Sequence, residues 1–482
     1  MLSVLSEHSN AADEPSSIAL LFIWQREASL KTDKSLASGF AEAIFSPSNN
    51  AIRYQLLAEI ANEAGGIASF RYIGKNIVVV SDPVAARELH TVHSGKLVRK
   101  GRINNTLRLT IGDSLLTVNG DSWLKLRQAV NPALSESAIE TYLPGLLYMY
   151  ARNFDHWLDR SISGPVVIRR KDIFATQYAA TAKLVFGFEI MDTDLDQLLK
   201  NDLENFAAMG LTVPTRVSLP HWIPFSESNK IMKRSMISGR ILQRYLDSFL
   251  ASDELSHKKS SILAFNLTEK SGSNRCPFNL SQTKDIDLVK TLFYSATLTT
   301  ATTLEWALRV LSYNRCEWQM VQNEIDSHVS CDSDILQALP SLQKCRSFVH
   351  EVTRRFPVIP SVVKTAIGDI SLSNAFIPRG SYVITSIYGI HTNPRFWMDP
   401  FTFQSDRFKS NYVHSDAYWP FSNGAHACPG KKLALSELVT TLALIIRRFN
   451  IVAQSTPELD GSCDSILVLP SGSDTYILEP RR

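Results

Sequence analysis

A ten-residue segment near the C-terminus, residues 421–430, constrains the fold more than any other part of this sequence. Its residues are Phe-Ser-Asn-Gly-Ala-His-Ala-Cys-Pro-Gly, and a helix is expected to follow directly, so Cys428 stands where a tight loop becomes a helix. Free N–H groups and the positive end of the helix dipole at that point favour a thiolate and hydrogen-bond its sulfur. Pro429 suits the first helical position, while Gly424 and Gly430 allow the backbone to approach closely. We therefore predict that Cys428 binds a ligand, although a buried cysteine that only packs would also fit the loop.

The segment resembles the haem-binding signature of the cytochrome P-450 family, Phe-x-x-Gly-x-Arg-x-Cys-x-Gly, at Phe421, Gly424, Cys428 and Gly430. The resemblance implies haem b as the cofactor, with the Cys428 sulfur as the axial ligand of its iron and the other three residues beside it. His426 departs from the signature, because the family has at this position an arginine that pairs with a haem propionate. Imidazole carries a full charge only if its pKa is raised. We interpret His426 as a weaker propionate ligand and not as a second iron ligand.

Two sequence patterns upstream match the family's structural support for the cysteine loop. In Glu351-Val-Thr-Arg354 the spacing of three puts both side chains on one helix face. The family adds an arginine from a Phe-x-x-x-Arg-Phe stretch, which here supplies Arg407. A buried carboxylate between two guanidinium groups would hold the region under the loop rigidly. The resemblance therefore implies a structural role for these three residues, whereas the Glu-x-x-Arg pair alone would indicate a surface ion pair.

Three further side chains are expected to bind the haem propionates. Trp123 and Arg127 match the family's Trp-x-x-x-Arg helix, and residues four apart share a helix face, so an indole N–H and a guanidinium could meet one propionate. Lys364 lies beyond the Glu-x-x-Arg helix, where the family often has another propionate-binding arginine. A lysine offers a point charge without the two-pronged guanidinium geometry. An ordinary amphipathic helix is the alternative interpretation of the tryptophan–arginine pair.

The segment Ser295-Ala-Thr-Leu-Thr-Thr300 resembles the family's oxygen-side helix, Ala/Gly-Gly-x-Asp/Glu-Thr-Thr/Ser. Thr299 matches the threonine that helps to protonate bound dioxygen, so Thr299 and the adjacent Thr300 are the candidate catalytic residues. Leu298 replaces the acid of the pattern and removes one group from the proton relay. We expect the threonines to bond to the preceding helical turn and to bend the helix. A plain position on the helix surface is the alternative.

With 482 residues and 44% hydrophobic content, the chain can bury a large core. Helical patterns dominate, and short strands are expected near both ends, so we predict a mainly α protein with a small β region, in the α+β class. The resemblance implies the triangular P-450 fold, with haem between the oxygen-side helix and the cysteine-loop helix. We expect a long loop over residues 95–120 and a final strand pair over residues 466–478. The predicted organisation is an irregular lead-in over residues 1–50 and one haem-binding catalytic domain over residues 51–482, with strands within residues 66–82, 358–390 and 464–480.

Charge and cysteine usage exclude several other classes of protein. Fifty Lys and Arg residues against 47 Asp and Glu give a net charge of +3, too small to indicate a nucleic-acid binder. The six cysteines form no Cys-x-x-Cys pair, which argues against zinc, thioredoxin-type and iron–sulfur sites. The apolar run Ile18–Trp24 is far shorter than the roughly 20 residues of a bilayer span, and no basic segment precedes it. We expect a cytoplasmic or peripherally membrane-associated protein that has no transmembrane span and is not secreted.

The leading hypothesis is an oxygen-dependent monooxygenase that hydroxylates or epoxidises a lipophilic small molecule in secondary metabolism. Because the sequence has no flavin or dinucleotide motif, NADPH would supply electrons through a separate reductase or a ferredoxin-type partner, with Lys431 and Lys432 as candidate docking residues. Leu298 motivates an alternative, a haem-thiolate isomerase, dehydratase or peroxide-rearranging enzyme that needs no activation of external O2. A haem-binding sensor or carrier is a third, non-enzymatic hypothesis. Dependence on NADPH and a reductase separates the first two.

Overall fold

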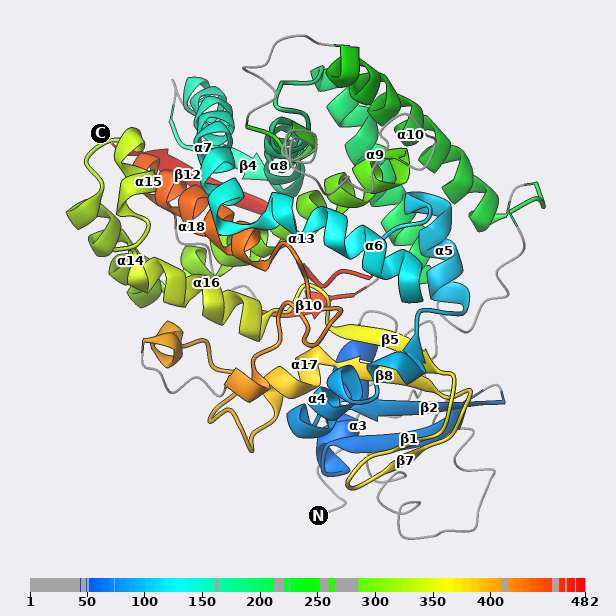
Figure 1. Cartoon of the computed structure of the whole chain (residues 1–482). Helices are drawn as coiled ribbons and strands as arrows, with labels where there is room; N and C mark the ends of the chain where they lie inside the picture. The colour runs from blue at the N-terminus through cyan, green and yellow to red at the C-terminus, as the bar shows by residue number, and fades with distance from the viewer. Residues whose placement is uncertain are drawn as a thin grey trace, which may run out of the picture.

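The computed structural model divides into a large helical part and a smaller part built around a β-sheet (Figure 1). In this view the sheet lies below the main group of helices, accompanied by α3 (Arg53–Glu63), α4 (Pro83–Thr91) and α17 (Ile387–Thr392). The predicted class, mainly α with a small β region, is confirmed. The structure describes residues 44, 49, 52–72, 74–160, 164–211, 221–224, 226–251, 260–264, 285–409, 415–452, 459–463, 466–472 and 474–481.

The largest sheet joins segments from the two ends of the sequence, as predicted. Within the described residues its order is β1-β2-β8-β5-β3, with β2 and β8 parallel and the other neighbours antiparallel. β1 and β2 form a hairpin whose turn holds Gly74 at φ +71°, a left-handed conformation that favours glycine. After β2, Asp82 caps α4 by accepting a hydrogen bond from the Ala85 N–H at 2.8 Å. The strands are β1 Ile67–Tyr72, β2 Lys75–Val80, β3 Leu97–Val98, β5 Ser361–Ala366 and β8 Tyr382–Ser386.

The long helix α13 (Asp285–Tyr313) runs through the middle of the helical part. It packs along α8 (Arg170–Phe186), and α8 packs in turn against α7 (Glu136–Asp159). The helix that follows the cysteine loop, α18 (Lys431–Arg448), contacts both α7 and α13. The other helices are α5 Arg102–Ile111, α6 Gly120–Val130, α9 Asp192–Leu211, α10 Glu227–Ala251, α14 Arg315–His328, α15 Ile335–Ala338 and α16 Gln343–Arg355.

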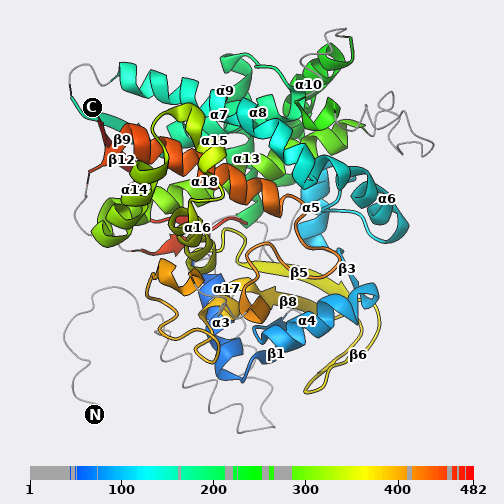
Figure 2. The ribbon, with the colours of Figure 1, turned by 60° about the vertical axis from the view of Figure 1, so that its left-hand side comes forward.

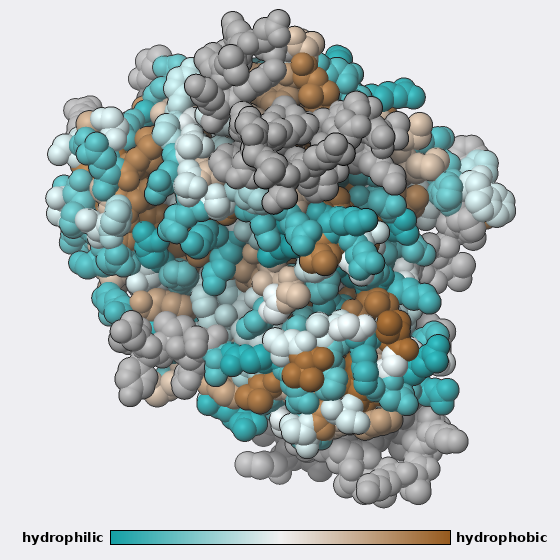
Figure 3. All heavy atoms as spheres, viewed as in Figure 1, coloured by the Kyte–Doolittle hydropathy of each residue, from teal (hydrophilic) through white to brown (hydrophobic). Residues whose placement is uncertain are grey.

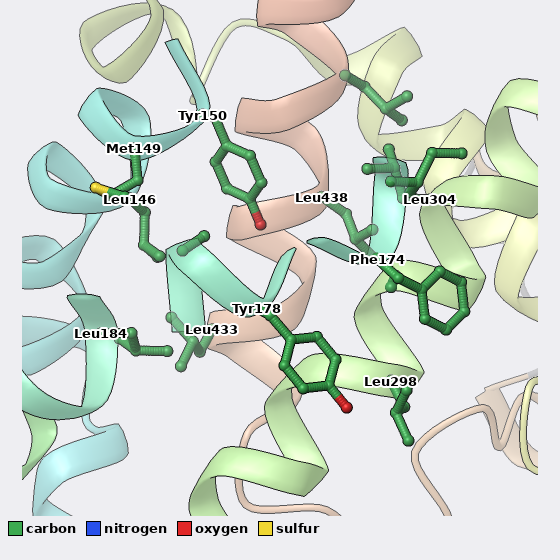
Figure 4. Close-up of a cluster of buried hydrophobic side chains, with 14 of the residues drawn as sticks. Leu146, Met149, Tyr150, Phe174, Tyr178, Leu184, Leu298, Leu304, Leu433 and Leu438 are labelled. Carbon is green, nitrogen blue, oxygen red and sulfur yellow. The ribbon is translucent and has the colours of Figure 1, made fainter. Parts of the chain in front are cut away.

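Side chains from α7, α8, α13 and α18 meet in one apolar core (Figure 4). Tyr150 of α7 points towards α18, whereas Tyr178 of α8 points towards α13 and lies near Leu298. Burying a side chain of Leu or Phe size fully contributes roughly 1.5–3 kcal/mol. The helix after the cysteine loop and the oxygen-side helix are therefore held by the same core.

The prediction of a long loop over residues 95–120 is wrong, because β3, all of α5 and the first residue of α6 lie there. Gly101 at φ +97° precedes α5 and Gly112 at φ +67° follows it. In sequence, two glycines with polar Asn and Thr residues between them are typical of a loop. Here the glycines adopt conformations that favour glycine at the two ends of a helix.

The prediction of a final strand pair over residues 466–478 is also wrong, because the strands there pair with other segments. β11 (Leu469–Pro470) pairs with β10 (Gly461–Ser462), whereas β12 (Thr475–Pro480) pairs with β4 and β9. The strand β4 was not predicted, and its four residues alternate between buried and exposed positions, as in a half-buried strand. The predicted irregular lead-in over residues 1–50 lies outside the described residues, apart from Ile44 and Asn49. The remaining short strands are β4 Val166–Arg169, β6 Ile370–Ser371, β7 Phe376–Ile377 and β9 Phe449–Ile451.

The surface mixes polar and apolar residues. On the face seen in Figure 3, apolar residues lie in small groups between hydrophilic ones. Within the part of the chain that the structure describes, no helix combines the length and apolarity needed to cross a bilayer.

Candidate functional site

The cysteine loop (residues 421–430) is a tight backbone turn stabilised by its own hydrogen bonds. Cys428 N donates to the Phe421 carbonyl at 2.9 Å, and Ala427 N donates to the Gly424 carbonyl at 3.0 Å. Gly424 has φ +75°, and a Cβ there would lie 2.3 Å from the carbonyl oxygen of His90. The close approach of α4 to the loop therefore requires glycine at this position.

Cys428 reaches the start of α18 with its side chain accessible. Neighbouring atoms nevertheless remove enough water to raise the thiol pKa, while the Gly430 backbone and the Arg127 guanidinium act in the opposite direction. A metal ion that binds such a sulfur deprotonates it. Among the described residues, no neighbour requires glycine at position 430, because a Cβ there would make an ordinary 3.9 Å contact with the Cys428 sulfur.

Glu351 and Arg354 form a fully buried, two-pronged ion pair on α16. Arg354 Nε and Nη2 each lie 2.7 Å from a different oxygen of the Glu351 carboxylate. Arg407 is less close than its predicted role implies, since its Nε lies 3.4 Å from Glu351 without a hydrogen bond. The Arg407 guanidinium instead donates to the Asp399 carbonyl at 2.8 Å. The fold thus brings all three residues together, but of the two arginines only Arg354 forms a two-pronged hydrogen-bonded pair with the Glu351 carboxylate.

A buried histidine connects this ion pair to the cysteine loop. Arg354 Nη1 donates to the His391 carbonyl at 2.9 Å, and His391 Nδ1 donates to the Arg354 carbonyl at 2.9 Å. On its other side, His391 Nε2 accepts the Trp419 backbone N–H at 2.8 Å. Burial lowers the pKa of His391 to about 3, so the ring is neutral, as this donor–acceptor pattern requires. The Trp419 carbonyl then accepts a hydrogen bond from Ser422 in the loop.

A cluster of cations, Arg99, Arg127 and Lys364, lies around His426 of the cysteine loop. Arg99 Nη2 lies 2.9 Å from His426 Nδ1, and Arg127 Nη1 donates to the Ala427 carbonyl at 2.7 Å. Strands β3 and β5 lie side by side in the sheet (Figure 2). Because Val98 pairs with Thr365 in antiparallel register, the next residue, Arg99, comes beside Lys364. Within the described residues none of the three cations forms an ion pair with a carboxylate.

His426 is a neutral ring in this setting. Burial and the adjacent Arg99 and Lys364 lower its pKa to about 3. Since a guanidinium can only donate, His426 Nδ1 must accept from Arg99, which leaves the other ring nitrogen to donate. Trp123 packs on the same ring, with centroids 4.1 Å apart. This contact and that of Arg127 with the loop backbone were not predicted, although both residues lie on one helix, α6, as their spacing predicts.

The Lys364 ammonium is an orphaned buried charge. The residue is 4% exposed, and among the described residues its Nζ has no hydrogen-bond partner. Burial, followed by repulsion from Arg99, lowers the pKa of Lys364 to about 8. An unpaired buried cation is costly unless an anion accompanies it. The residues therefore fit a cofactor that brings carboxylates to the cation cluster and metal to the accessible sulfur, as haem does.

On α13 the predicted oxygen-side turn has two different faces. Ser295 is exposed and Thr299 is half-buried, and the Thr299 hydroxyl donates to the Ser295 carbonyl at 2.7 Å. The predicted bonding of threonines to the preceding turn is therefore observed here. Thr300 is 5% exposed and Leu298 is 1% exposed, so neither shares the open face of Thr299. Thr297, also fully buried, faces the interior as well.

Sequence reasoning missed Arg99, His391 and Trp419. None of them lies in a spacing pattern that indicates a site. The role of Arg99 depends on a strand pairing with residues far along the chain, and that of His391 on two backbone contacts. The candidate docking residue Lys432 is exposed and pairs with Glu136 at 2.9 Å.

Comparisons with known proteins find relatives over most of this chain. The family model described as Cytochrome P450 matches residues 40–477. Protein LUTEIN DEFICIENT 5, chloroplastic, from Arabidopsis thaliana is 23% identical, covering 84% of this chain and 70% of that protein. The (+)-piperitol/(+)-sesamin synthase CYP81Q2 from Sesamum radiatum is 23% identical over 86% of this chain and 84% of that protein. The crystal structure of cytochrome P450DA heme domain has the same fold, with a TM-score of 0.74, 19% identity and coverage of 90% and 93%.

Proposed function

Because this chain belongs to the cytochrome P-450 family, we propose that it is a haem-thiolate monooxygenase that hydroxylates or epoxidises a lipophilic small molecule of secondary metabolism. The observation that carries the proposal is the accessible Cys428 sulfur next to a cation cluster for which the described residues provide no carboxylate partner. The names of two plant relatives support small-molecule metabolism as the setting.

The protein's part in the reaction begins with holding the cofactor. Cys428 would ligate the iron, and Arg99, Arg127 and Lys364 would hold the propionates, next to the packed rings of Trp123 and His426. When bound, the haem supplies the oxygen activation and the oxidising power that no side chain provides. Glu351 and Arg354 keep the cysteine loop in position through His391.

On the opposite side, α13 presents hydroxyl groups to the reacting molecules. The Thr299 hydroxyl donates a hydrogen bond to the Ser295 carbonyl. It can turn to another acceptor, because this bond is made to the helix backbone and not to a fixed side chain. Thr300 is buried beside Thr299 and supports the turn.

Electrons must come from outside this chain, since its sequence has no flavin or dinucleotide motif. We assign them to NADPH through a separate reductase or ferredoxin-type protein. Lys431 and Lys432 remain the candidate docking residues at the start of α18. Exposed charges of this kind steer the encounter more than they determine affinity.

One observation favours a second candidate, a haem-thiolate isomerase, dehydratase or peroxide-rearranging enzyme. Leu298 occupies the position of the acid on the oxygen-side helix and is 1% exposed. Such an enzyme would turn over at full rate without NADPH or a reductase.

Two measurements test the proposal. The reduced protein with carbon monoxide should give the strongly red-shifted Soret band of a thiolate ligand, and a histidine-type band would refute the ligand assignment. Compounds that give a substrate-binding difference spectrum should then be oxidised only with O2, NADPH and a reductase. Conversion without all three would favour the second candidate.

A further inference from the structure

Three polar side chains from different helices form a closed ring inside the helical core. They are Tyr150 of α7, Gln177 of α8 and Glu437 of α18, which are 1%, 0% and 1% exposed. The Tyr150 hydroxyl lies 2.6 Å from Gln177 Oε1 and 2.7 Å from Glu437 Oε1, and Gln177 Nε2 donates to Glu437 Oε1 at 2.9 Å. Figure 4 shows Tyr150 reaching from α7 towards α18. The proposed function uses none of the three side chains.

The number of hydrogens in the ring indicates that the Glu437 carboxyl is protonated. The ring has three contacts, and Tyr150 and Gln177 place only one hydrogen each in them. A neutral carboxyl supplies the third, so that Glu437 donates to Tyr150, Tyr150 to Gln177, and Gln177 back to Glu437. The Thr441 hydroxyl beside Tyr150 donates elsewhere, to the Glu437 backbone carbonyl at 2.8 Å. Burial raises the pKa of Glu437 to about 7, and its hydrogen bonds oppose this only partly.

Gln177 also contacts the oxygen-side turn of α13. Its Nε2 carries two hydrogens, and only one of them is used in the ring. The same nitrogen lies 3.3 Å from the Ala296 carbonyl and 3.4 Å from the Thr181 hydroxyl of its own helix. The carbonyl before that of Ala296, which belongs to Ser295, accepts the Thr299 hydroxyl at 2.7 Å. Two successive carbonyls of the turn therefore accept side-chain donors, and such donors bend helices locally.

We propose that Gln177 is a positioning residue of the oxygen-side turn. Its ring with Tyr150 and Glu437 orients the amide so that the second N–H holds the Ala296 carbonyl. Glu437 lies on α18, the helix that begins just after Cys428. The ring therefore connects the turn that carries Thr299 with the helix that follows the proposed iron ligand. The inference rests on the proposed monooxygenase function, in which the threonine hydroxyl must face a molecule bound at the iron.

The directions of these bonds explain why polar groups occupy this part of the core. Apolar neighbours of the ring, such as Leu146 and Leu438, pack without a preferred direction. Hydrogen bonds of 2.6–2.9 Å restrict both the distance and the angle between the helices that supply them. Apolar residues of similar volume would stabilise a core at least as well as buried polar groups do. The position that the ring fixes therefore explains its presence better than the stability that it adds.

Infrared difference spectroscopy tests the hydrogen count of the ring. At pH 6, below the Glu437 pKa of about 7, the spectrum of the wild-type holoprotein minus that of Glu437→Gln should contain a carboxylic-acid C=O band. Glu324→Gln is the matched control and should give no such band. Glu324 is also buried, but its two oxygens accept the backbone N–H groups of Lys344 and Cys345 at 2.7 and 2.8 Å, so these contacts need no carboxyl hydrogen. Absence of the band in the Glu437→Gln difference overturns the closed ring and the proposal with it.

The C–O stretch of the reduced carbon monoxide complex tests the position of the turn, because gas bound at the iron would face it. Gln177→Met keeps the length of the side chain and removes both N–H groups, so it should shift or broaden the band. Tyr150→Phe leaves the bond between Gln177 and Glu437 and should have a smaller effect. Adding Tyr150→Phe to Gln177→Met should change nothing further, because Tyr150 acts only through Gln177. An unchanged band in Gln177→Met, or fully additive effects, would contradict the proposal.

A loss of stability alone must not produce the same shift. Glu324→Gln weakens buried hydrogen bonds between α14 and α16, none of which involves the oxygen-side turn. Urea unfolding should show that Glu324→Gln and Gln177→Met both lose stability, whereas only Gln177→Met changes the C–O band. A shifted band in Glu324→Gln would mean that the band reports stability and not the contact with Ala296, which refutes the positioning role.

Product formation tests the consequence for the reaction, using O2, NADPH, a surrogate reductase and a compound that gives a binding difference spectrum. Gln177→Met should lower the rate by about tenfold or more, because a small displacement from a reactive geometry can cost about a hundredfold. If the wild type forms no product, the monooxygenase function fails, while the two infrared tests still decide whether Gln177 positions the turn. If the wild type is active and Gln177→Met keeps its rate, the function stands and the positioning role is wrong.

Discussion

The cysteine-loop side and the α13 side of the site are held by different kinds of interaction. Under the loop, the buried Glu351–Arg354 pair and neutral His391 bind backbone carbonyls and amides in fixed geometry. On α13, threonine hydroxyls such as that of Thr299 bond to the helix's own carbonyls. Charge pairs of this kind resist movement, whereas a hydroxyl can exchange one acceptor for another. A metal ligand needs the first arrangement, and a group that passes protons needs the second.

The two sides also depart from the family pattern in different ways. At position 426 a guanidinium is missing, and the structure places Arg99 directly on the histidine that replaces it. At position 298 an acid is missing, and the leucine that replaces it is 1% exposed and packs into the core. The group lost at position 426 is therefore matched by one from a different segment of the chain, whereas an apolar residue fills position 298.

The largest effect is expected on the loop side, for Cys428→Ala. Removing the sulfur should abolish the red-shifted carbon monoxide band completely, because no other described cysteine lies in the loop. Cys316→Ala, which removes another accessible cysteine, is the control and should keep the band. Survival of the band in Cys428→Ala would mean that the ligand assignment is wrong.

Next in size is the loss of the buried ion pair. Glu351→Gln should lower the free energy of unfolding by roughly 3–5 kcal/mol, because it leaves the Arg354 charge buried and unpaired. Lys432→Ala breaks an exposed pair and should change the free energy by less than about 1 kcal/mol. Urea unfolding of both variants measures the difference, and equal effects would contradict the assigned rigidity of the loop side.

A pH dependence should reveal the orphaned charge of Lys364 in cofactor-free protein. Its pKa is about 8 in the folded chain against an ordinary value of 10.5, so between these values the unfolded chain binds more protons. Stability should therefore rise with pH from about 8 to 10.5, by on the order of 2 kcal/mol. Lys364→Met should remove this slope, whereas Lys100→Met, an exposed neighbour, should keep it. A flat profile in the unmodified protein would show that Lys364 has an anionic partner already.

The smallest effect expected is that of Arg99→Leu on haem retention. Losing one charged hydrogen bond of about 1.5–3 kcal/mol should speed haem transfer to apomyoglobin by tenfold or more. His426→Arg in the same background should recover part of the loss, since it returns a guanidinium to the loop. Arg71→Leu, on the exposed hairpin, is the control. Unchanged transfer in Arg99→Leu would leave Arg127 and Lys364 as the cations that hold the propionates.

The sequence predicts this site best where the chemistry is local. The cysteine loop, the Glu351–Arg354 spacing and the Trp123–Arg127 spacing each place their residues within a few positions, so a pattern can reveal them. Arg99 cannot be found in this way, because Lys364 comes beside it only through the pairing of β3 with β5. The sequence shows that residue 426 is a histidine, but the neutral state of its ring depends on burial and on the cations around it.

The same limit explains the errors in the fold. Glycines on either side of α5 indicate a loop in sequence, and only the backbone angles show that they end a helix. The partners of β12 lie at opposite ends of the helical part of the sequence, which no local pattern encodes. Arg407 was assigned correctly to the neighbourhood of Glu351, but the direction of its donors depends on the Asp399 backbone.

The parallel pairing of β2 with β8 decides when the protein can acquire its cofactor. Ile77 pairs with Tyr382, so the N-terminal hairpin gains its neighbour in the sheet only after most of the chain has been synthesised. Pairings across such a long sequence separation form slowly. Arg99 meets Lys364 through the same sheet, and Cys428 is made later still. The proposed haem site can therefore form only after the segments that carry β2, β8 and Cys428 have all been synthesised, and chains truncated before Cys428 should bind haem poorly.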